Sequence, residues 1–257
     1  MAIAKRAVRV RNVLIGGDEP CICAPVVGAD TKQVLEETRQ ITEKKPHLIE
    51  WRADFFEAIR DEQEVAATSR KMRAIAGDIP ILFTVRSEQE GGQPISLTEE
   101  EKIRLFETVC ESGAIDLLDY ELAHGTRIPI VRELTRRYGV RLVLSYHNFD
   151  HTPSKEELVA KMRQAEQCGA DIAKAAVMPK TRGDVLTLLQ ATEEARKEVD
   201  IPLITMSMGA LGAITRLAGG LFGSAVTFAV GRQSSAPGQI PIEDVRTALS
   251  VIMTYGQ

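Results

Sequence analysis

The feature that most constrains the fold of this chain is a regular alternation of short apolar runs with longer polar stretches. Eight runs rich in Val, Ile and Leu lie at 22–27, 48–53, 81–85, 115–122, 141–146, 172–177, 203–208 and 224–230. They lack a clean apolar–polar alternation, which is typical of parallel strands covered on both faces. Each is followed by a predicted helix, at 31–44, 61–76, 97–112, 127–138, 154–167, 181–198, 211–219 and 242–254. Eight strand–helix units in 257 residues predict an α/β fold, a (β/α)8 TIM barrel.

The rest of the chain is compatible with this barrel. An open doubly wound sheet is the alternative, but the turn after the first run, Gly28-Ala29-Asp30, lacks the glycine-rich phosphate fingerprint of that fold. The first twenty residues stand outside the repeat. The alternating segment Val8-Arg9-Val10-Arg11 and the turn signal Gly16-Gly17 predict an N-terminal β-hairpin over 1–20. With no linker or low-complexity segment, residues 1–257 are expected to form a single barrel domain.

Composition excludes several classes of protein. The chain is 44% hydrophobic and 26% charged, and its net charge of -4 gives no general attraction to nucleic acid or to an anionic membrane. No apolar stretch approaches the ~20 residues of a membrane span, and the N-terminus lacks the apolar core of a secretion signal. The cysteines match no zinc spacing and are too sparse for a disulfide framework; they are Cys21, Cys23, Cys110 and Cys168. We therefore expect reduced thiols and a cytoplasmic protein.

Lys174 is the most informative single residue, because it lies in the middle of the apolar run 172–177. Removing an ammonium from water is costly unless the charge is paired or the amine loses its proton. A desolvated neutral amine is also what imine chemistry requires, since only that form attacks a carbonyl. The alternative is a structural lysine whose stem packs at the strand end while its head reaches water.

Other polar residues fall where the predicted strands end, which is the face of a barrel that carries the active site. They are Glu50 and Arg52, Arg86 and Glu90, Asp119 and Glu121, His147, Met206, Ser235 and Gln239, with Arg216 in the seventh predicted helix. Each has a structural alternative. Glu50 and Arg52 could form an ion pair, Arg86 could cap a loop, and Arg216 could be surface charge. His147 and His151 are four residues apart, but their loop-like context does not favour a metal site. The convergence of all these residues at one barrel end favours an active site.

Six segments in order at barrel spacing resemble the type I 3-dehydroquinate dehydratases, lyases of the shikimate pathway to chorismate and the aromatic amino acids. They are Glu50-Trp51-Arg52-Ala53-Asp54, Phe83-Thr84-Val85-Arg86-Ser87 with Glu90-Gly91-Gly92, Ser145-Tyr146-His147-Asn148-Phe149, Asp171-Ile172-Ala173-Lys174-Ala175-Ala176-Val177-Met178-Pro179, Ile204-Thr205-Met206-Ser207-Met208-Gly209 and Ser235-Ala236-Pro237-Gly238-Gln239. The resemblance covers nearly the whole chain. One position departs from the family pattern: Pro25 stands near the end of the first run, where the family has a serine near the substrate.

The resemblance implies dehydration of 3-dehydroquinate to 3-dehydroshikimate without metal or cofactor. Lys174 would form a Schiff base with the substrate ketone, and His147 would act as general base and then general acid. A histidine suits both roles because its ordinary pKa of ~6.5 is near working pH. Glu90 would hold the His147 ring in the correct tautomer and orientation.

The resemblance also assigns the substrate contacts. Arg216 would bind the carboxylate, helped by Ser235 and Gln239, and Met206 would line the pocket. Glu50, Arg52 and Arg86 would contact the hydroxyls. The loop that ends in Pro237-Gly238-Gln239 is expected to close over the site as a lid. The resemblance implies a homodimer with the small-molecule substrate as ligand. The net charge and the lack of a long apolar stretch give no reason to expect a nucleic-acid or membrane partner. Two alternatives remain: a class I, Schiff-base aldolase-type barrel, and a barrel without chemistry that binds a metabolite or a protein.

Overall fold

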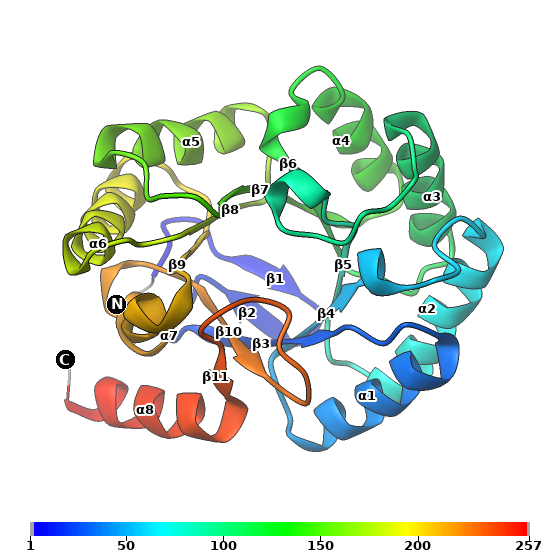
Figure 1. Cartoon of the computed structure of the whole chain (residues 1–257), viewed down its shortest axis with the longest axis horizontal. Helices are drawn as coiled ribbons and strands as arrows, with labels where there is room; N and C mark the ends of the chain where they lie inside the picture. Colours follow the sequence, from blue (N-terminus) through cyan, green and yellow to red (C-terminus); the bar gives the residue numbers. More distant parts are fainter. Residues whose placement is uncertain (1–2, 256–257) are drawn as a thin grey trace.

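A parallel sheet curled into a barrel forms the centre of the computed structural model, which describes residues 3–255 (Figure 1). Within those residues the sheet runs in the order β11-β10-β3-β4-β5-β6-β7-β8-β9. It closes where β9 meets β10, through a parallel bridge between Leu203 and Ser224. The strands are β3 (Cys21–Val26), β4 (Leu48–Arg52), β5 (Ile81–Thr84), β6 (Leu117–Glu121), β7 (Arg141–Asn148), β8 (Ile172–Val177), β9 (Leu203–Ser207), β10 (Val226–Val230) and the short β11 (Ile240–Pro241).

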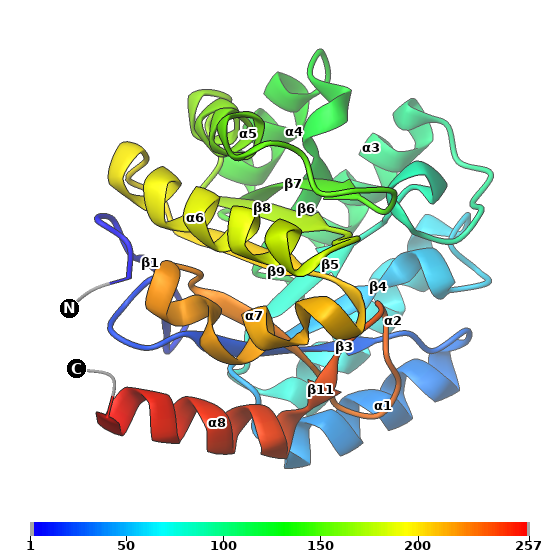
Figure 2. The same cartoon turned by 60° about the vertical axis from the view of Figure 1, so that its left-hand side comes forward.

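Helices surround the sheet on its outer side, as Figure 1 shows. In the described part of the chain these are α1 (Thr31–Glu43), α2 (Glu62–Ala76), α3 (Glu99–Glu111), α4 (Ile128–Arg137), α5 (Lys155–Gln167), α6 (Arg182–Glu198), α7 (Gly209–Phe222) and α8 (Ile242–Tyr255). Several begin at side-chain caps; Thr98 and Thr181 each start a capping box. Figure 2 shows α6, α7 and α8 stacked along one flank. Every predicted strand and helix is present, so the (β/α)8 barrel prediction is confirmed.

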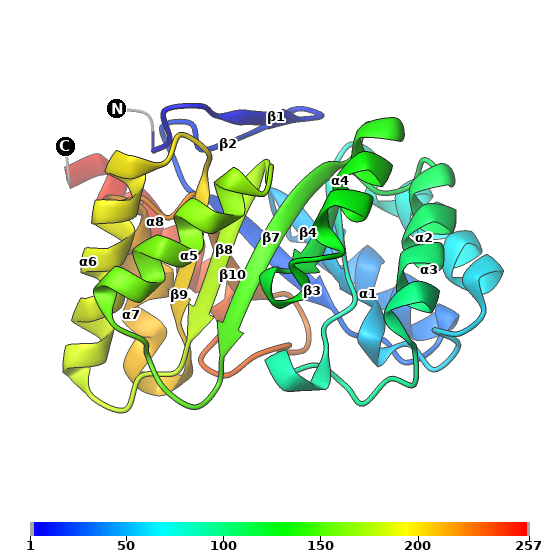
Figure 3. The same cartoon turned by 90° about the horizontal axis from the view of Figure 1, so that it is seen from above.

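The N-terminal hairpin is also confirmed, although its turn was misplaced. Strands β1 (Val8–Val10) and β2 (Val13–Ile15) pair antiparallel, with Val10 opposite Val13. The turn is therefore Arg11-Asn12, with Arg11 at a positive φ of 51°, and Gly16-Gly17 follows the second strand. Figure 3 shows the hairpin lying across the end of the barrel at which the strands begin. Its buried Val8, Val10 and Ile15 join the apolar cluster inside the barrel and shield that end from water.

Two apolar layers fix the direction in which each strand presents its side chains. The outer layer packs strands against helices and includes edge-to-face contacts of Trp51 with Phe56 and Phe83. The inner layer fills the hairpin end of the barrel with Leu48, Leu82, Leu117, Val143 and Ile172. Successive strand residues alternate between the two sides, so the next inward residues lie one step towards the opposite end. Those residues are polar.

Candidate active site

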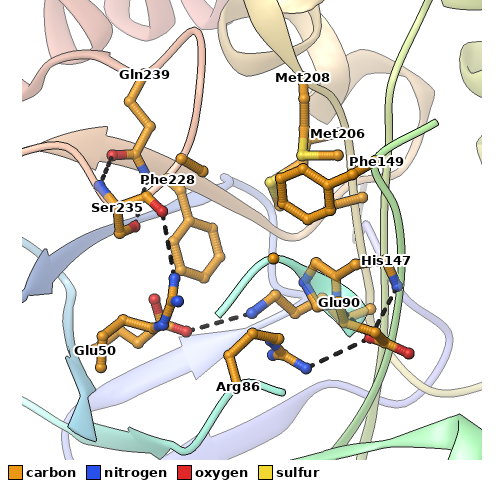
Figure 4. Close-up of a pocket in the computed structure, with 15 residues that line it drawn as sticks. Glu50, Arg86, Glu90, His147, Phe149, Met206, Met208, Phe228, Ser235 and Gln239 are labelled. Atoms are coloured by element: carbon orange, nitrogen blue, oxygen red, sulfur yellow. Dashed lines mark hydrogen bonds and ion pairs between the residues drawn. The ribbon is translucent and has the colours of Figure 1, made fainter. Parts of the chain in front are cut away.

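The inner faces of the strands change from apolar to polar along each strand. Leu48 is followed on the inner face of β4 by Glu50 and Arg52, and Ile172 is followed on β8 by Lys174. Nine of the ten predicted site residues line one pocket at this end: Glu50, Arg52, Arg86, Glu90, His147, Lys174, Met206, Ser235 and Gln239. Figure 4 shows Glu50, Ser235 and Gln239 on one side of it and Glu90 and His147 on the other. Strands distant in sequence thus supply one site.

Lys174 is buried at the base of the pocket, with 6% of its surface exposed. Its Nζ donates to Asp119 Oδ2 at 2.9 Å and to Glu50 Oε1 at 3.3 Å. The same nitrogen lies 4.7 Å from the centre of the Phe228 ring. The alternative of a lysine whose head reaches water is therefore wrong. The burial expected from the apolar run is confirmed, but two carboxylates accompany the apolar walls.

Asp119, on the inner face of β6, is a central residue of the site to which neither the strand pattern nor the family resemblance assigned a role. Besides Lys174, its carboxylate accepts from Arg86 Nη2 at 2.7 Å and from Ser145 Oγ at 2.6 Å. Burial alone would raise the pKa of Asp119, but the charges of Arg86 and Lys174 hold it well below its usual range. The carboxylate is thus a fixed negative charge beside the amine. Its inward position follows from strand alternation, since Leu117, Asp119 and Glu121 share one face of β6.

His147 and Glu90 form a hydrogen-bonded pair at the wall of the pocket. His147 Nδ1 lies 2.8 Å from Glu90 Oε2, and the His147 backbone N–H donates to the same oxygen at 3.0 Å. Burial, and then the positive charges of Arg86 and Lys174, lower the pKa of His147 well below its ordinary value. Burial raises the pKa of Glu90 to about 8, against the opposing charge of Arg86. His147 is thus neutral at neutral pH, and its Nε2 is the ring nitrogen that Glu90 leaves unoccupied.

Arg86 and Arg52 are held by internal carboxylates. Arg86 donates to Asp119, to Ser145 Oγ at 2.8 Å and to Glu121 Oε1 at 3.2 Å, so it ties strands β5, β6 and β7 together. Arg52 donates two hydrogen bonds to the Asp54 carboxylate, from Nε at 2.8 Å and from Nη2 at 2.7 Å. The suggested ion pair between Glu50 and Arg52 is wrong, because Glu50 Oε1 accepts from Thr84 at 2.9 Å and from Lys174.

Arg216 lies behind the pocket wall on α7 and is only 1% exposed, so the surface-charge alternative is wrong. Its Nη1 donates to Phe228 O at 3.3 Å and its Nη2 to Pro237 O at 3.1 Å. Among residues 3–255 its Nε has no hydrogen-bond partner and the guanidinium has no carboxylate within 4 Å. Burial lowers the pKa of Arg216 to about 10, which still leaves it charged at neutral pH. A buried cation held only by two carbonyls and the Met206 sulfur, with no anion beside it among residues 3–255, is suited to an anionic ligand.

The loop 231–239 covers the pocket. Arg52 Nη1 donates to Ser235 O at 3.3 Å. The Gln239 side-chain oxygen accepts from the Ser235 backbone N–H, and the Gln239 side-chain nitrogen donates to the Ser235 hydroxyl. Gly238 adopts a φ of +76°, and a Cβ there would lie 2.3 Å from Gly209 O, so only glycine fits. The covered pocket keeps about 40 Å³ of free space. A ligand larger than a few waters therefore requires the loop to move.

Three further findings concern metal binding, membrane spans and the cysteines. In the described residues no group of three or more His, Cys, Asp or Glu is placed to hold a metal ion. Between residues 3 and 255 no helix is long and apolar enough to cross a membrane. The four cysteines are free thiols.

Comparisons with known proteins show the family to which the chain belongs. The sequence model of the family described as type I 3-dehydroquinase matches residues 22–255. The chain is 76% identical to a 3-dehydroquinate dehydratase of Geobacillus thermodenitrificans, over 100% of both chains. A crystal structure of 3-dehydroquinate dehydratase from Geobacillus kaustophilus superposes with a TM-score of 0.99 at 66% identity, covering 100% of both chains. The type I enzyme of Clostridium difficile superposes at 0.93 with 38% identity, covering 98% of this chain and 99% of that one. The chain belongs to the type I 3-dehydroquinase family.

Proposed function

We propose that this chain dehydrates 3-dehydroquinate to 3-dehydroshikimate through an imine between the substrate ketone and Lys174. The observation that carries the proposal is the position of the Lys174 amine, buried at the base of a pocket beside the His147–Glu90 pair. Family membership supports the dehydratase activity and decides against the aldolase and non-catalytic alternatives. The Clostridium difficile relative was solved with covalently modified comenic acid, which is in keeping with a reactive group in such a site.

In the first step the Lys174 ammonium gives one proton to His147, and the neutral amine attacks the ketone carbon. His147 returns that proton to the carbinolamine hydroxyl, which leaves as water and gives a protonated imine. The imine nitrogen carries a positive charge where the ammonium was. Asp119 and Glu50, at 2.9 and 3.3 Å from Nζ, supply the opposite charge. A counter-charge in a buried site keeps the imine protonated, and the protonated form is the better electron sink.

His147 then performs the elimination. Its Nε2 removes a proton from the carbon next to the imine, and the electron pair moves to the imine nitrogen to form an enamine. The enamine expels the hydroxyl group from the following carbon, and His147 returns the proton to it, so one water leaves. Hydrolysis of the remaining conjugated imine releases the product and restores Lys174. The Nδ1 contact with Glu90 fixes which ring nitrogen faces the substrate.

The remaining residues bind and orient the substrate in this proposal. Arg216 pairs with the carboxylate, which replaces the Pro237 carbonyl now on its Nη2. Arg52 exchanges the Ser235 carbonyl for a substrate hydroxyl when the loop opens and recloses.

The other contacts complete the ring of substrate-binding groups. Glu50 and Arg86 contact the remaining hydroxyls, Ser235 and Gln239 close over the carboxylate, and Met206 forms an apolar wall. Pro25 lies beside Glu50 in the sheet and has no hydroxyl, so the serine contact of the family is missing here.

We also propose that the enzyme is a cytoplasmic homodimer, as the family resemblance implies. The four free thiols suit a reducing compartment. Sedimentation of the purified protein tests the dimer, and a species with the mass of one chain at micromolar concentration would contradict it.

Borohydride trapping tests the imine. The protein is mixed with 3-dehydroquinate, reduced with borohydride and digested, and the modified peptide is mapped by mass spectrometry. A ligand-sized adduct on Lys174 supports the mechanism. Product formation by ultraviolet absorbance without an adduct on Lys174 would leave the reaction standing and reject the role of the lysine. Neither product nor adduct would reject the proposed function.

A further inference from the structure

A groove lined by arginines lies at the end of the barrel opposite the active site. It has a volume of about 550 Å³ and runs between the N-terminal hairpin and the last turns of α4 and α5. Figure 3 shows the hairpin over this end. Its charged lining comes from separate elements of the chain: Arg6, Arg9, Arg132, Arg136, Arg141, Glu166 and Asp171. The five arginines exceed the two carboxylates by three positive charges, whereas the whole chain carries a net charge of -4.

The two carboxylates of the groove are already engaged. Asp171 Oδ2 accepts from Arg132 Nη1 at 2.6 Å and from the Leu142 backbone N–H at 2.8 Å. Glu166 Oε1 accepts from the backbone N–H groups of Asp200 and Ile201, at 2.9 and 3.2 Å. Because backbone contacts hold both carboxylates in place, they cannot move to neutralise the remaining arginines.

Three of the arginines have no anionic partner in the part of the chain that the structure describes. Other surface arginines are mixed in this respect: Arg60 lies within 4 Å of Glu101 and Arg137 within 4 Å of Glu107, whereas Arg70 and Arg182 have no such contact among residues 3–255. No such contact is made by the exposed side chains of Arg6, Arg9 and Arg136 within residues 3–255. The groove is distinguished by the number of unpaired arginines that converge in one concavity. Arg132 adds a buried Nε with no hydrogen-bond partner among those residues.

Helix dipoles neutralise only part of the excess positive charge in the groove. The C-terminal ends of α4 and α5 border the groove, and each contributes roughly half a negative charge. Together they offset about one of the three excess positive charges. The rest is concentrated in a concave surface, which raises the local concentration of anions.

We propose that this groove binds a small polyanion that carries two phosphoryl groups. Arginine binds phosphoryl oxygens through a planar fork of N–H donors, and several forks in one concavity favour a ligand with oxygens pointing in several directions. The unpaired arginines stand on two sides of the groove, Arg9 on β1 and Arg136 on α4, so each of two phosphoryl groups meets its own guanidinium. Each phosphoryl group carries about −1.5 to −2 charges at neutral pH, which suits a cationic groove. The site is separate from the barrel mouth and independent of the proposed dehydratase mechanism.

Inorganic pyrophosphate is the probe for this site. Titrated calorimetrically into the full chain at low ionic strength, it is expected to bind saturably with one site per chain and to weaken as salt is added. Loss of one charge-assisted contact should lower affinity on the order of tenfold in each of Arg9→Ala and Arg136→Ala. Arg137→Ala is the matched control, because Arg137 neighbours Arg136 on α4 but pairs with Glu107 and lies outside the groove. It should bind as the unmodified chain does.

Several results would overturn the proposal. One is the absence of saturable binding at millimolar pyrophosphate, and another is an equal loss of affinity in Arg137→Ala. Loss of binding in Arg216→Ala with full binding in Arg136→Ala would place the ion in the barrel mouth instead. Citrate binding as tightly as pyrophosphate would reject the phosphoryl preference. Circular dichroism and dehydroquinate turnover of each groove variant confirm that it is folded, since the groove lies at the far end from the substrate.

Discussion

Replacing Asp119 with Asn removes the negative charge beside Lys174 while keeping the size of the side chain. At the observed 2.9 Å, unit charges attract each other by about 6 kcal/mol at an effective dielectric constant of ~20. Only part of this is lost, because Glu50 remains 3.3 Å from Nζ and the amide oxygen still accepts a hydrogen bond. We expect the transition states that carry the imine charge to lose about 2–3 kcal/mol, which is on the order of a hundredfold in kcat/KM.

Two measurements separate this effect from a general loosening of the site. Steady-state turnover is followed by the ultraviolet absorbance of the conjugated product, and imine formation by the yield of borohydride adduct on Lys174. Without its counter-charge the protonated imine is less stable relative to the free amine. The adduct yield at saturating substrate should therefore fall, and its pH profile should shift to lower pH.

Ser145→Ala is the control, because it removes another hydrogen bond to Asp119, of 2.6 Å, without changing any charge. We expect its kcat/KM to stay within about tenfold of the unmodified enzyme, from the loss of the hydrogen bonds that its hydroxyl makes with Asp119 and Arg86. Equal losses in the two variants would mean that Asp119 acts by holding Ser145 and Arg86. Unchanged kcat/KM and adduct yield in Asp119→Asn would refute the counter-charge argument altogether.

The remaining predictions concern the proposed catalytic and binding residues. Lys174→Ala should abolish turnover while calorimetry still detects substrate binding, and near-normal turnover would reject the imine. His147→Ala should still give the borohydride adduct but slow kcat by roughly 10²–10⁴-fold, so dehydration at the normal rate would remove the histidine from its role. Because the pKa of Glu90 is raised to about 8, its acceptor form grows as pH rises, and kcat/KM should rise through that pH. Glu90→Gln should lose this inflection, and a profile unchanged by the substitution would assign the titration to another group. Arg216→Ala should raise KM on the order of tenfold to a hundredfold, for one charge-assisted carboxylate contact, with a smaller change in kcat; constant values of both would place the carboxylate elsewhere.

Much of the fold was predictable because its signals are local. Apolar runs, helix caps and the lengths between them depend on neighbouring residues, and eight such units leave few arrangements other than a closed barrel. The same locality explains the one misplaced turn. Gly16-Gly17 was the stronger turn signal, yet the hairpin turns at Arg11-Asn12, because pairing of Val10 with Val13 buries Val8 and Ile15 together.

The apolar run around Lys174 and the polar residues at the predicted strand ends indicated a buried lysine and one functional end of the barrel, while the alternative of a lysine whose head reaches water stayed open. Which side chains contact each other followed only from the three-dimensional arrangement of the strands. Lys174 lies 55 residues from Asp119 and 124 from Glu50, and Arg52 selects Asp54 instead of Glu50. Burial of Arg216 behind Phe228 and Pro237 was likewise invisible in the sequence. The physical reason is that contacts across a barrel depend on its stagger and closure, and these are set by all eight strands together.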